Sequence, residues 1–296
     1  MKRSRIGITR RRFCQCAAAT TLAAGAATFG YTWRIEPHWV QVVGRDLPID
    51  RLPPSLINQT LVQISDLHIG PVVDEAYMTR AMKRVSLLKA DILAITGDFM
   101  TYDGDAQIER TVRVLQHLQR GRLATLAVLG NHDYGPGWSQ PQVAQRLTRR
   151  LENLGIRVLR NTKFQIEGLW FVGIDDLWSP AFAPELVMPT VEPDRPAVVL
   201  CHNPDAADLP VWSGYRGWIL CGHTHGGQCR PPFGSPPRLP VKNKRYAAGE
   251  IDLHDGRRLY VNRGLGYLRR VRFNVRPEIT AFKLTRTQSP PFAPNT

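Results

Sequence analysis

The chain has 296 residues, of which 43% are hydrophobic, so it can bury one large α/β core or two small ones. Its 39 lysines and arginines outnumber 25 acidic residues, which gives a formal net charge of +14. Five cysteines exclude a disulfide framework: Cys14 and Cys16 lie in the N-terminal segment, so Cys201, Cys221 and Cys229 can form at most one bridge. We expect Cys201 and Cys221 to be small buried hydrophobic residues, because both lie in apolar runs.

The first 33 residues are typical of an export signal. Residues 1–33 contain six cations and no acidic residue, and "TRRRFCQ" at 9–15 places paired arginines before an aromatic residue. This pattern resembles a twin-arginine signal, so we expect export by the twin-arginine machinery to the periplasm or the extracytoplasmic membrane face. The alternative is a transmembrane anchor, since ~20 helical residues reach ~30 Å. The sequence Ala24-Gly25-Ala26 offers a cleavage pattern, and the choice between cleavage and retention stays open.

Residues 34–60 are expected to be a linker, and from Leu61 strand and helix patterns alternate. We predict strands at 61–69, 91–99 and 124–133 and helices at 75–89, 107–120 and 140–154, which is a βαβ arrangement. After Gly155 the pattern is rich in short apolar strands. The sequence therefore predicts one α/β domain over 61–287, with two sheets packed face to face between helices. The Pro/Ser-rich tail at 288–296 is expected to be disordered.

Polar side chains cluster where the apolar runs end. Asp66 and His68 follow "LVQIS", Asp98 follows "LAITG", Asn131 and His132 follow "LAVLG", His202 follows "VVLC", and His223 and His225 follow "WILCG". Ligands of open α/β sheets gather at the carboxyl ends of strands, so these residues are expected to share one rim. The glycines of "LCGHTHGGQ" allow the chain to turn between its two histidines, although such a pair taken alone also fits a solvated turn.

Five short motifs now carry a resemblance. "DLH" (66–68), "GD" (97–98), "GNHD" (130–133), "CH" (201–202) and "GHTH" (222–225) resemble, in order, the motif set of the calcineurin-like metallophosphoesterases. The resemblance covers residues 61–228. It implies a four-layer α-β-β-α sandwich with two mixed β-sheets. It also implies a metal-dependent phosphoesterase that hydrolyses phosphate monoesters or diesters with metal-activated hydroxide.

The resemblance implies two divalent metal ions and their ligands. One ion would be held by Asp66, His68, Asp98 and His225, and the other by Asp98, Asn131, His202 and His223. Asp98 would bridge, since a carboxylate can join cations ~3.5–4 Å apart. The nitrogen and oxygen ligands suit Mn, Fe or Zn without selecting one. Such ions lower the pKa of water from 15.7 to ~7, which makes hydroxide available at neutral pH.

His132 would have a different role from the ligands. The matching residue of the family faces the substrate and stabilises or protonates the leaving oxygen, which suits an imidazole. The alternatives are a loose metal contact or a core histidine. Asp133 is expected to buttress the loop. His38, His117 and His254 lie outside the motifs and receive no functional role.

Looser similarities concern the substrate and the partners. "VGIDD" (172–176), "GGQCRPPFG" (226–234) and the region 262–280 resemble exported or membrane-associated phosphoesterases, some of which act on lipid-linked substrates such as UDP-diacylglucosamine pyrophosphates. Two groups of basic residues could contact an anionic membrane surface. The first group is Arg230, Arg238, Lys242, Lys244 and Arg245, and the second is Arg263, Arg269, Arg270 and Arg272. Ordinary solvated surface charge explains both groups equally well. The alternative function is a non-catalytic protein that binds an anionic polymer or nucleic acid. Only Tyr267 and Phe273 interleave with the second basic group, so nucleic acid is not the expected partner.

Overall fold

The computed structural model describes residues 9–102 and 104–287. The expected disordered tail and the first eight residues of the expected signal lie outside them. The α-helices are α1 (Arg10–Gly30), α2 (Glu75–Ser86), α3 (Asp105–Leu115) and α4 (Pro141–Asn153). The strands are β1 (Gln41–Ile49), β2 (Thr60–Ile64), β3 (Ile92–Thr96), β4 (Ala124–Val128), β5 (Arg157–Val158), β6 (Thr162–Ile166), β7 (Leu169–Ile174), β8 (Ala197–Cys201), β9 (Gly217–Cys221), β10 (Gly249–Asp252), β11 (Arg257–Val261) and β12 (Glu278–Arg286).

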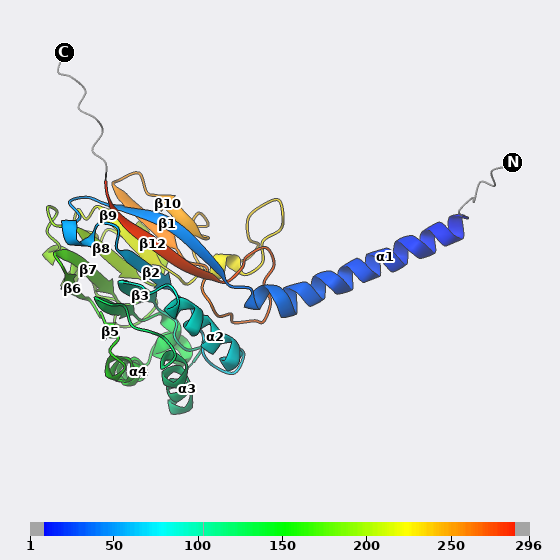
Figure 1. Cartoon of the computed structure of the whole chain (residues 1–296), viewed down its shortest axis with the longest axis horizontal. Helices are drawn as coiled ribbons and strands as arrows, with labels where there is room; N and C mark the ends of the chain where they lie inside the picture. Colours follow the sequence, from blue (N-terminus) through cyan, green and yellow to red (C-terminus); the bar gives the residue numbers. More distant parts are fainter. Residues whose placement is uncertain (1–8, 103, 288–296) are drawn as a thin grey trace, which may run out of the picture.

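The strands form two six-stranded mixed sheets (Figure 1). The first has the order β1-β12-β2-β3-β4-β5, and the second has the order β10-β11-β9-β8-β7-β6. Strands β2, β3 and β4 are parallel, as are β7, β8 and β9, so the carboxyl ends of each set lie at one edge of its sheet. These are the ends that carry the predicted polar residues.

The two sheets pack face to face around a shared apolar core. Leu61, Ile92 and Leu126 of the first sheet lie in one buried cluster with Val198 and Leu220 of the second. A second cluster lies between the first sheet and helices α2 to α4, and the outer face of the second sheet is covered by loops and short 3-10 helices. The predicted α/β fold with two mixed sheets is confirmed. Cys201 and Cys221 are buried and unbridged, as expected.

The expected linker at 34–60 is corrected by the structure. It contains β1, which pairs in parallel with β12 over nine residues, from Gln41 opposite Glu278 to Ile49 opposite Arg286. Leu47, Ile49 and Leu52 are buried in the core between the sheets. The sequence "QVVGRDLPI" conceals this strand because glycine, proline and two charges interrupt its apolar pattern.

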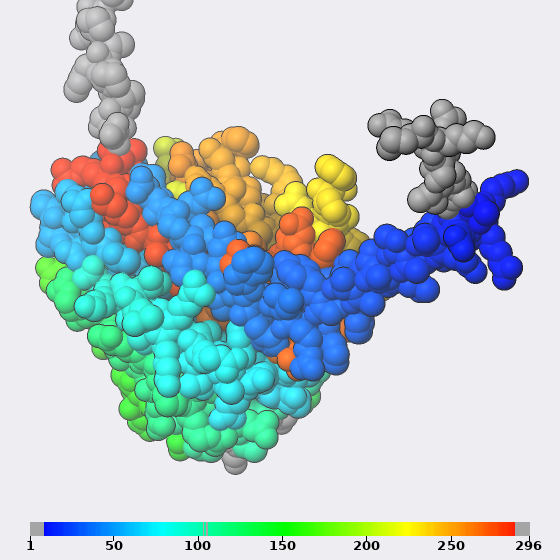
Figure 2. Space-filling view, turned by 45° about the vertical axis from the view of Figure 1, so that its right-hand side comes forward, coloured from blue at the N-terminus to red at the C-terminus, as the bar shows by residue number. Residues whose placement is uncertain are grey.

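Helix α1 projects away from the body of the protein (Figures 1 and 2). None of its residues is buried. A search of the described residues finds no helix with both the length and the apolar character that a membrane crossing requires.

The segment 31–38, which follows α1, is attached to the loop 263–276. Thr32 accepts a hydrogen bond from the backbone N–H of Arg272, and the buried Glu36 carboxylate accepts one from Val275 at 2.6 Å. His38 Nε2 lies 3.1 Å from the Tyr267 hydroxyl. The chain therefore joins the body beside a loop that, as described below, reaches the metal centre.

Candidate metal centre

The structure brings the predicted polar residues to one rim, where the carboxyl ends of β2, β3, β4, β8 and β9 meet. Seven residues supply ligand atoms to three overlapping groups, each with atoms within 4.8 Å of one another: Asp66, His68 and His225; His68, Asp98 and His132; and Asp98, His202 and His223. Because His68 and Asp98 are shared, the groups form one continuous cluster. All members except the half-buried His132 are buried.

The first part of the cluster joins β2, β3 and the turn after β9. His68 Nε2 lies 3.4 Å from Asp98 Oδ2, and His225 Nε2 lies 3.4 Å from Asp66 Oδ1. The two imidazole Nε2 atoms face each other at 2.9 Å. Electron-rich nitrogen and oxygen atoms at this spacing need a cation or a proton between them, so this part of the cluster can hold a metal ion.

The second part is centred on His202 and His223. His202 Nε2 lies 3.2 Å from Asp98 Oδ2 and 3.3 Å from His223 Nδ1. The other nitrogen of each ring lies at hydrogen-bond distance from a backbone carbonyl: His202 Nδ1 is 2.7 Å from Thr96, and His223 Nε2 is 2.9 Å from Pro240. Donating there fixes each ring so that its inner lone pair faces the cluster, which is how metal-binding histidines are oriented.

Asn131 supplies a further indication of a metal. Its side chain is completely buried, yet neither its amide oxygen nor its amide nitrogen has a hydrogen-bond partner among the described residues. Buried polar groups are normally paired, and an orphaned amide oxygen beside a His/Asp cluster is explained by a cation. The donor set therefore fits the metal ions that the sequence implies.

Electrostatics favour neutral imidazoles in this cluster. Burial lowers the pKa of His68 and His223 to about 3, and lowers the pKa of His225 well below its usual value. Neutral imidazole is the form that binds metals. Burial also lowers the pKa of His202, but the carboxylates of Asp98, Asp66 and Asp176 together outweigh it and hold this pKa well above its usual value. A cation beside Asp98 would replace that proton.

The backbone of the cluster is strained. Five predicted ligands have positive φ angles, in the left-handed region that favours glycine: Asp66 (51°), His68 (46°), Asp98 (54°), His223 (74°) and His225 (50°). Such residues cost ~1–3 kcal/mol each and gather at functional sites. Gly222 is required for another reason, because a Cβ atom there would lie 1.9 Å from Ser65 Oγ and 2.4 Å from Asp66 Oδ2.

His132 lies at the exposed edge of the cluster. Its backbone N–H donates to Asp98 Oδ1 at 3.0 Å, and its Nδ1 lies 2.5 Å from the Thr101 carbonyl, which leaves Nε2 free. His132 also belongs to the group with His68 and Asp98. Its position is therefore compatible with either role, a general acid or a loose metal contact. Asp133 accepts bonds from Phe99, Met100 and Gly130 and buttresses the loop, as expected.

Two members of the second basic group, Arg263 and Arg272, are not available to an anionic surface, whereas Arg269 is exposed and Arg270 is partly exposed. Arg272 is completely buried, and its guanidinium donates to the backbone carbonyls of Arg263, Gly264, Gly266 and Val275 and lies 3.5 Å from His225 Nδ1. Arg263 pairs with Glu278. The burial of Arg272 cannot be predicted from its local sequence, because it depends on backbone carbonyls of the folded loop.

Sequence reasoning also missed two tryptophans beside the cluster. Trp138 and Trp178 stack with ring centroids 4.9 Å apart. Trp178 contacts His223, and Trp138 contacts His132, both edge-on. Their positions soon after "GNHD" and "VGIDD" were the only available hint.

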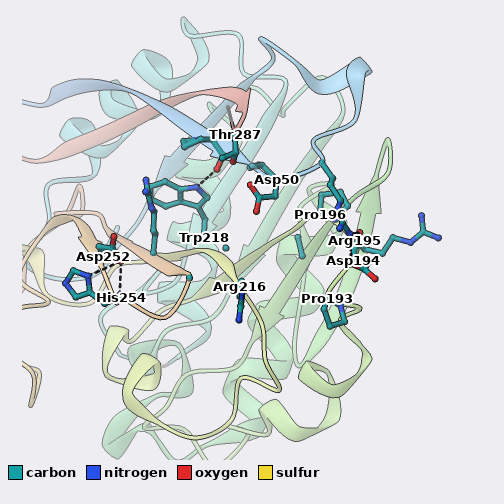
Figure 3. Close-up of a pocket in the computed structure, with 17 residues that line it drawn as sticks. Asp50, Pro193, Asp194, Arg195, Pro196, Arg216, Trp218, Asp252, His254 and Thr287 are labelled. Atoms are coloured by element: carbon teal, nitrogen blue, oxygen red, sulfur yellow. Dashed lines mark hydrogen bonds and ion pairs between the residues drawn. The ribbon is translucent and has the colours of Figure 1, made fainter. Parts of the chain in front are cut away.

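A cavity of about 600 Å³ lies elsewhere, at the opposite ends of the strands (Figure 3). Ala197 and Gly217, the first residues of β8 and β9, line it together with Arg216, Trp218 and His254. It contains no member of the metal cluster. Its charged residues are of both signs, as the labelled Arg216, Asp50 and Asp252 show in Figure 3. Its lining therefore selects no single class of ligand.

Comparison with known proteins gives consistent matches. Residues 60–227 match the family described as calcineurin-like phosphoesterase. Phosphodiesterase YaeI of Escherichia coli is 33% identical over 286 residues, which is 94% of this chain and 99% of the relative. UDP-2,3-diacylglucosamine pyrophosphatase LpxG of Chlamydia trachomatis is 28% identical over 316 residues, covering 88% of this chain and 94% of the relative. The uncharacterized metallophosphoesterase YkuE of Bacillus subtilis is 30% identical over 280 residues, which is 90% of this chain and 94% of the relative.

Proposed function

Because this chain belongs to the calcineurin-like phosphoesterase family and is a phosphoric ester hydrolase, we propose that it cleaves phosphate monoesters or diesters with two divalent metal ions. Asp66, His68, Asp98 and His225 would hold one ion, and Asp98, Asn131, His202 and His223 the other. When bound, such ions supply an activated water and neutralise charge on the phosphoryl oxygens. Manganese, zinc and iron all suit these ligands.

The observation that best supports this proposal is the convergence of donor atoms around Asp98. Asp98 Oδ2 lies 3.4 Å from His68 Nε2 and 3.2 Å from His202 Nε2, so one carboxylate reaches both halves of the cluster. His132 would act on the leaving group. With its Nδ1 held by the Thr101 carbonyl, Nε2 is the atom that can hold a proton for the leaving oxygen.

The alternative is a protein that binds an anionic polymer without catalysis. Such a protein has no need for strained ligand residues, yet five predicted ligands have positive φ angles. Every predicted ligand position is also occupied by a residue able to bind metal. These two observations favour the enzyme.

The proposal is tested by hydrolysis of p-nitrophenyl phosphate and bis(p-nitrophenyl) phosphate. The protein is freed of metal with EDTA and assayed with and without Mn²⁺ or Zn²⁺. We expect turnover only with metal, none in Asp98→Asn, and normal turnover in the control His254→Ala, whose imidazole is exposed. Two bound ions without turnover of either ester would contradict the enzyme and favour the binding protein.

We also propose that the substrate is lipid-linked or belongs to the cell envelope, and that the enzyme works at the extracytoplasmic face of a membrane. The similarity to a UDP-2,3-diacylglucosamine pyrophosphatase supports the first part. Exposed apolar side chains at the base of α1 support the second: Trp33, Ile35, Trp39 and Leu268. Arg34 and Arg270 lie over the Trp33 ring, and Arg276 lies over Trp39. Tryptophan and arginine together suit the headgroup region of anionic lipids.

Vesicle sedimentation tests this membrane contact. The full chain should bind vesicles that contain phosphatidylglycerol more than vesicles of phosphatidylcholine, and added salt should weaken the binding. Replacing Trp33 and Trp39 by serine should reduce it, whereas Trp170→Ser, a half-buried tryptophan of β7, should not. Equal binding to both lipids by all variants would contradict the proposal.

A further inference from the structure

Two tryptophans form an aromatic strip along the rim of the metal centre. The strip, defined as His132, Trp138, Trp178 and His223, runs from one half of the metal cluster to the other. Its neighbouring ring centroids are 6.1, 4.9 and 4.5 Å apart. The two indoles are nearly parallel, at 22°, and the two imidazoles meet them edge-on.

The two indoles reach the strip from different sheets. Trp138 follows β4 of the first sheet, and Trp178 follows β7 of the second. Trp138 has a φ of 56°, a strained value for a tryptophan, and it follows Gly137, which also has a positive φ. The fold therefore accepts backbone strain to place this indole at the rim.

Trp178 is fixed by a buried carboxylate. Asp176 Oδ1 accepts the backbone N–H of Trp178 at 2.8 Å, and the side chain of Asp176 is completely buried. The "VGIDD" sequence, which the metal chemistry leaves without a role, thus ends in a residue that positions Trp178.

The paired indoles differ from the buried Trp212 and Trp218 in their indole N–H groups. The indole N–H of Trp212 donates to Ala206 and that of Trp218 donates to Pro48. Within the described residues, neither Trp138 nor Trp178 has a hydrogen-bond partner for its indole N–H, and both side chains are only partly buried. Flat apolar surface and two free donors therefore border the metal centre.

We propose that Trp138 and Trp178 bind a planar ring of the substrate, such as a nucleobase, carried by the phosphate that the metal centre holds. This inference rests on the proposed function, because the metal centre places the phosphate. His132 and His223 both belong to the cluster, and each contacts one of the indoles, so a substrate whose phosphate is held there can reach the indoles with its ester group. Any flat aromatic ring can stack on an indole, whatever polar groups the ring carries. The free indole N–H groups can donate hydrogen bonds to acceptor atoms of the ring.

The experiment compares two phosphates that differ only in the ring. AMP and ribose 5-phosphate are titrated into the Mn²⁺-loaded protein by calorimetry, both in the form of methylene phosphonates, which a phosphoesterase cannot hydrolyse. The protein of natural sequence should bind AMP more tightly than ribose 5-phosphate. Trp138→Leu and Trp178→Leu should each weaken AMP binding by roughly 5- to 150-fold and change ribose 5-phosphate binding much less. The matched control is Trp170→Leu, whose indole lies under Lys163, and it should bind both ligands normally.

Three results would overturn the inference. The first is equal affinity of the natural sequence for AMP and ribose 5-phosphate, and the second is an equal loss of affinity for both ligands in the leucine variants. The third is tighter binding of octyl phosphate than of AMP, which would identify the strip as an acyl-chain surface. A second titration separates failure of the strip from failure of the metal centre. Adenosine, which has no phosphate, is added to the protein while tryptophan fluorescence is measured. Quenching that both leucine variants lose supports the strip even if no phosphate binds, and an absence of quenching contradicts it.

Discussion

Replacing Arg272 by methionine should strongly destabilise the protein. Methionine fills part of the space of the arginine stem but removes the buried guanidinium. That group donates to the carbonyls of Gly266 at 2.7 Å, Arg263 at 3.0 Å, Val275 at 3.1 Å and Gly264 at 3.2 Å. In the variant these oxygens lose their charged donor.

The size of the effect follows from two opposing terms. Three N–H groups do the donating, one on Nη1 and two on Nη2, and the two on Nη2 are shared among three carbonyls. A hydrogen bond that involves a charged group contributes ~1.5–3 kcal/mol, so three of them contribute ~4.5–9 kcal/mol before the cost of burial. Burial lowers the pKa of Arg272 to about 10, which corresponds to a cost of ~3 kcal/mol for burying the charge. We therefore expect the free energy of unfolding to fall by ~1.5–6 kcal/mol.

Urea denaturation followed by circular dichroism measures this loss. Arg269→Met is the matched control, because Arg269 is exposed on the same loop, and it should change the free energy of unfolding by less than ~0.5 kcal/mol. Arg272→Lys keeps the charge without the planar fork and should be intermediate. A loss below ~1 kcal/mol in Arg272→Met would refute the reasoning.

The same variant has a second readout in metal binding. The loop held by Arg272 pairs with the strand end that carries a ligand, since Leu265 N–H donates to the Ser65 carbonyl and Gly266 N–H to the Asp66 carbonyl. Mn²⁺ affinity should therefore fall in Arg272→Met and stay normal in Arg269→Met. Unchanged affinity would show that the loop supports the fold without positioning Asp66.

Four further outcomes are expected. Asp98→Asn should abolish turnover and reduce metal content together, measured by kinetics and elemental analysis, and full occupancy with normal turnover would contradict its bridging role. His132→Ala should keep its metals while turnover falls roughly 10²–10⁴-fold, with a smaller loss for nitrophenyl esters than for alkyl esters; loss of metal would make it a ligand. EDTA should lower the melting temperature measured by calorimetry, and added Mn²⁺ should restore it in proportion to the logarithm of its concentration; a melting temperature insensitive to metal argues against the site. Replacing both Arg10 and Arg11 by lysine should keep active enzyme inside the cell, as fractionation would show, whereas normal export would refute the twin-arginine reading.

The sequence predicts that these polar residues lie together because strand ends are local features, and the structure places them in one cluster, while their roles as ligands stay predictions. Asp66, Asp98 and His202 each follow a short apolar run, and parallel strands bring such ends to one edge. The motif order then allows each position to be matched with a ligand role. The helices α2, α3 and α4 were also predicted, with ends that differ by a few residues, because their apolar periodicity is strong.

The features that the sequence concealed depend on contacts between distant segments. β1 was missed because its pairing with β12 stabilises it despite Gly44 and Pro48. Trp138 and Trp178 are 40 positions apart, and only the packing of the two sheets brings their rings together. The burial of Arg272 depends likewise on carbonyl groups of a folded loop.

The position of β12 constrains when this protein can fold. Although it is the last strand along the part of the chain that the structure describes, it lies between β1 and β2, parallel to one and antiparallel to the other. During synthesis on a ribosome, β1 therefore has no neighbour in its sheet until residues 278–286 emerge from the exit tunnel. Contacts between such distant segments form slowly, because a long loop must close before they form. We expect β1 to join the first sheet only after residues 278–286 have emerged, so that this sheet is completed late in folding.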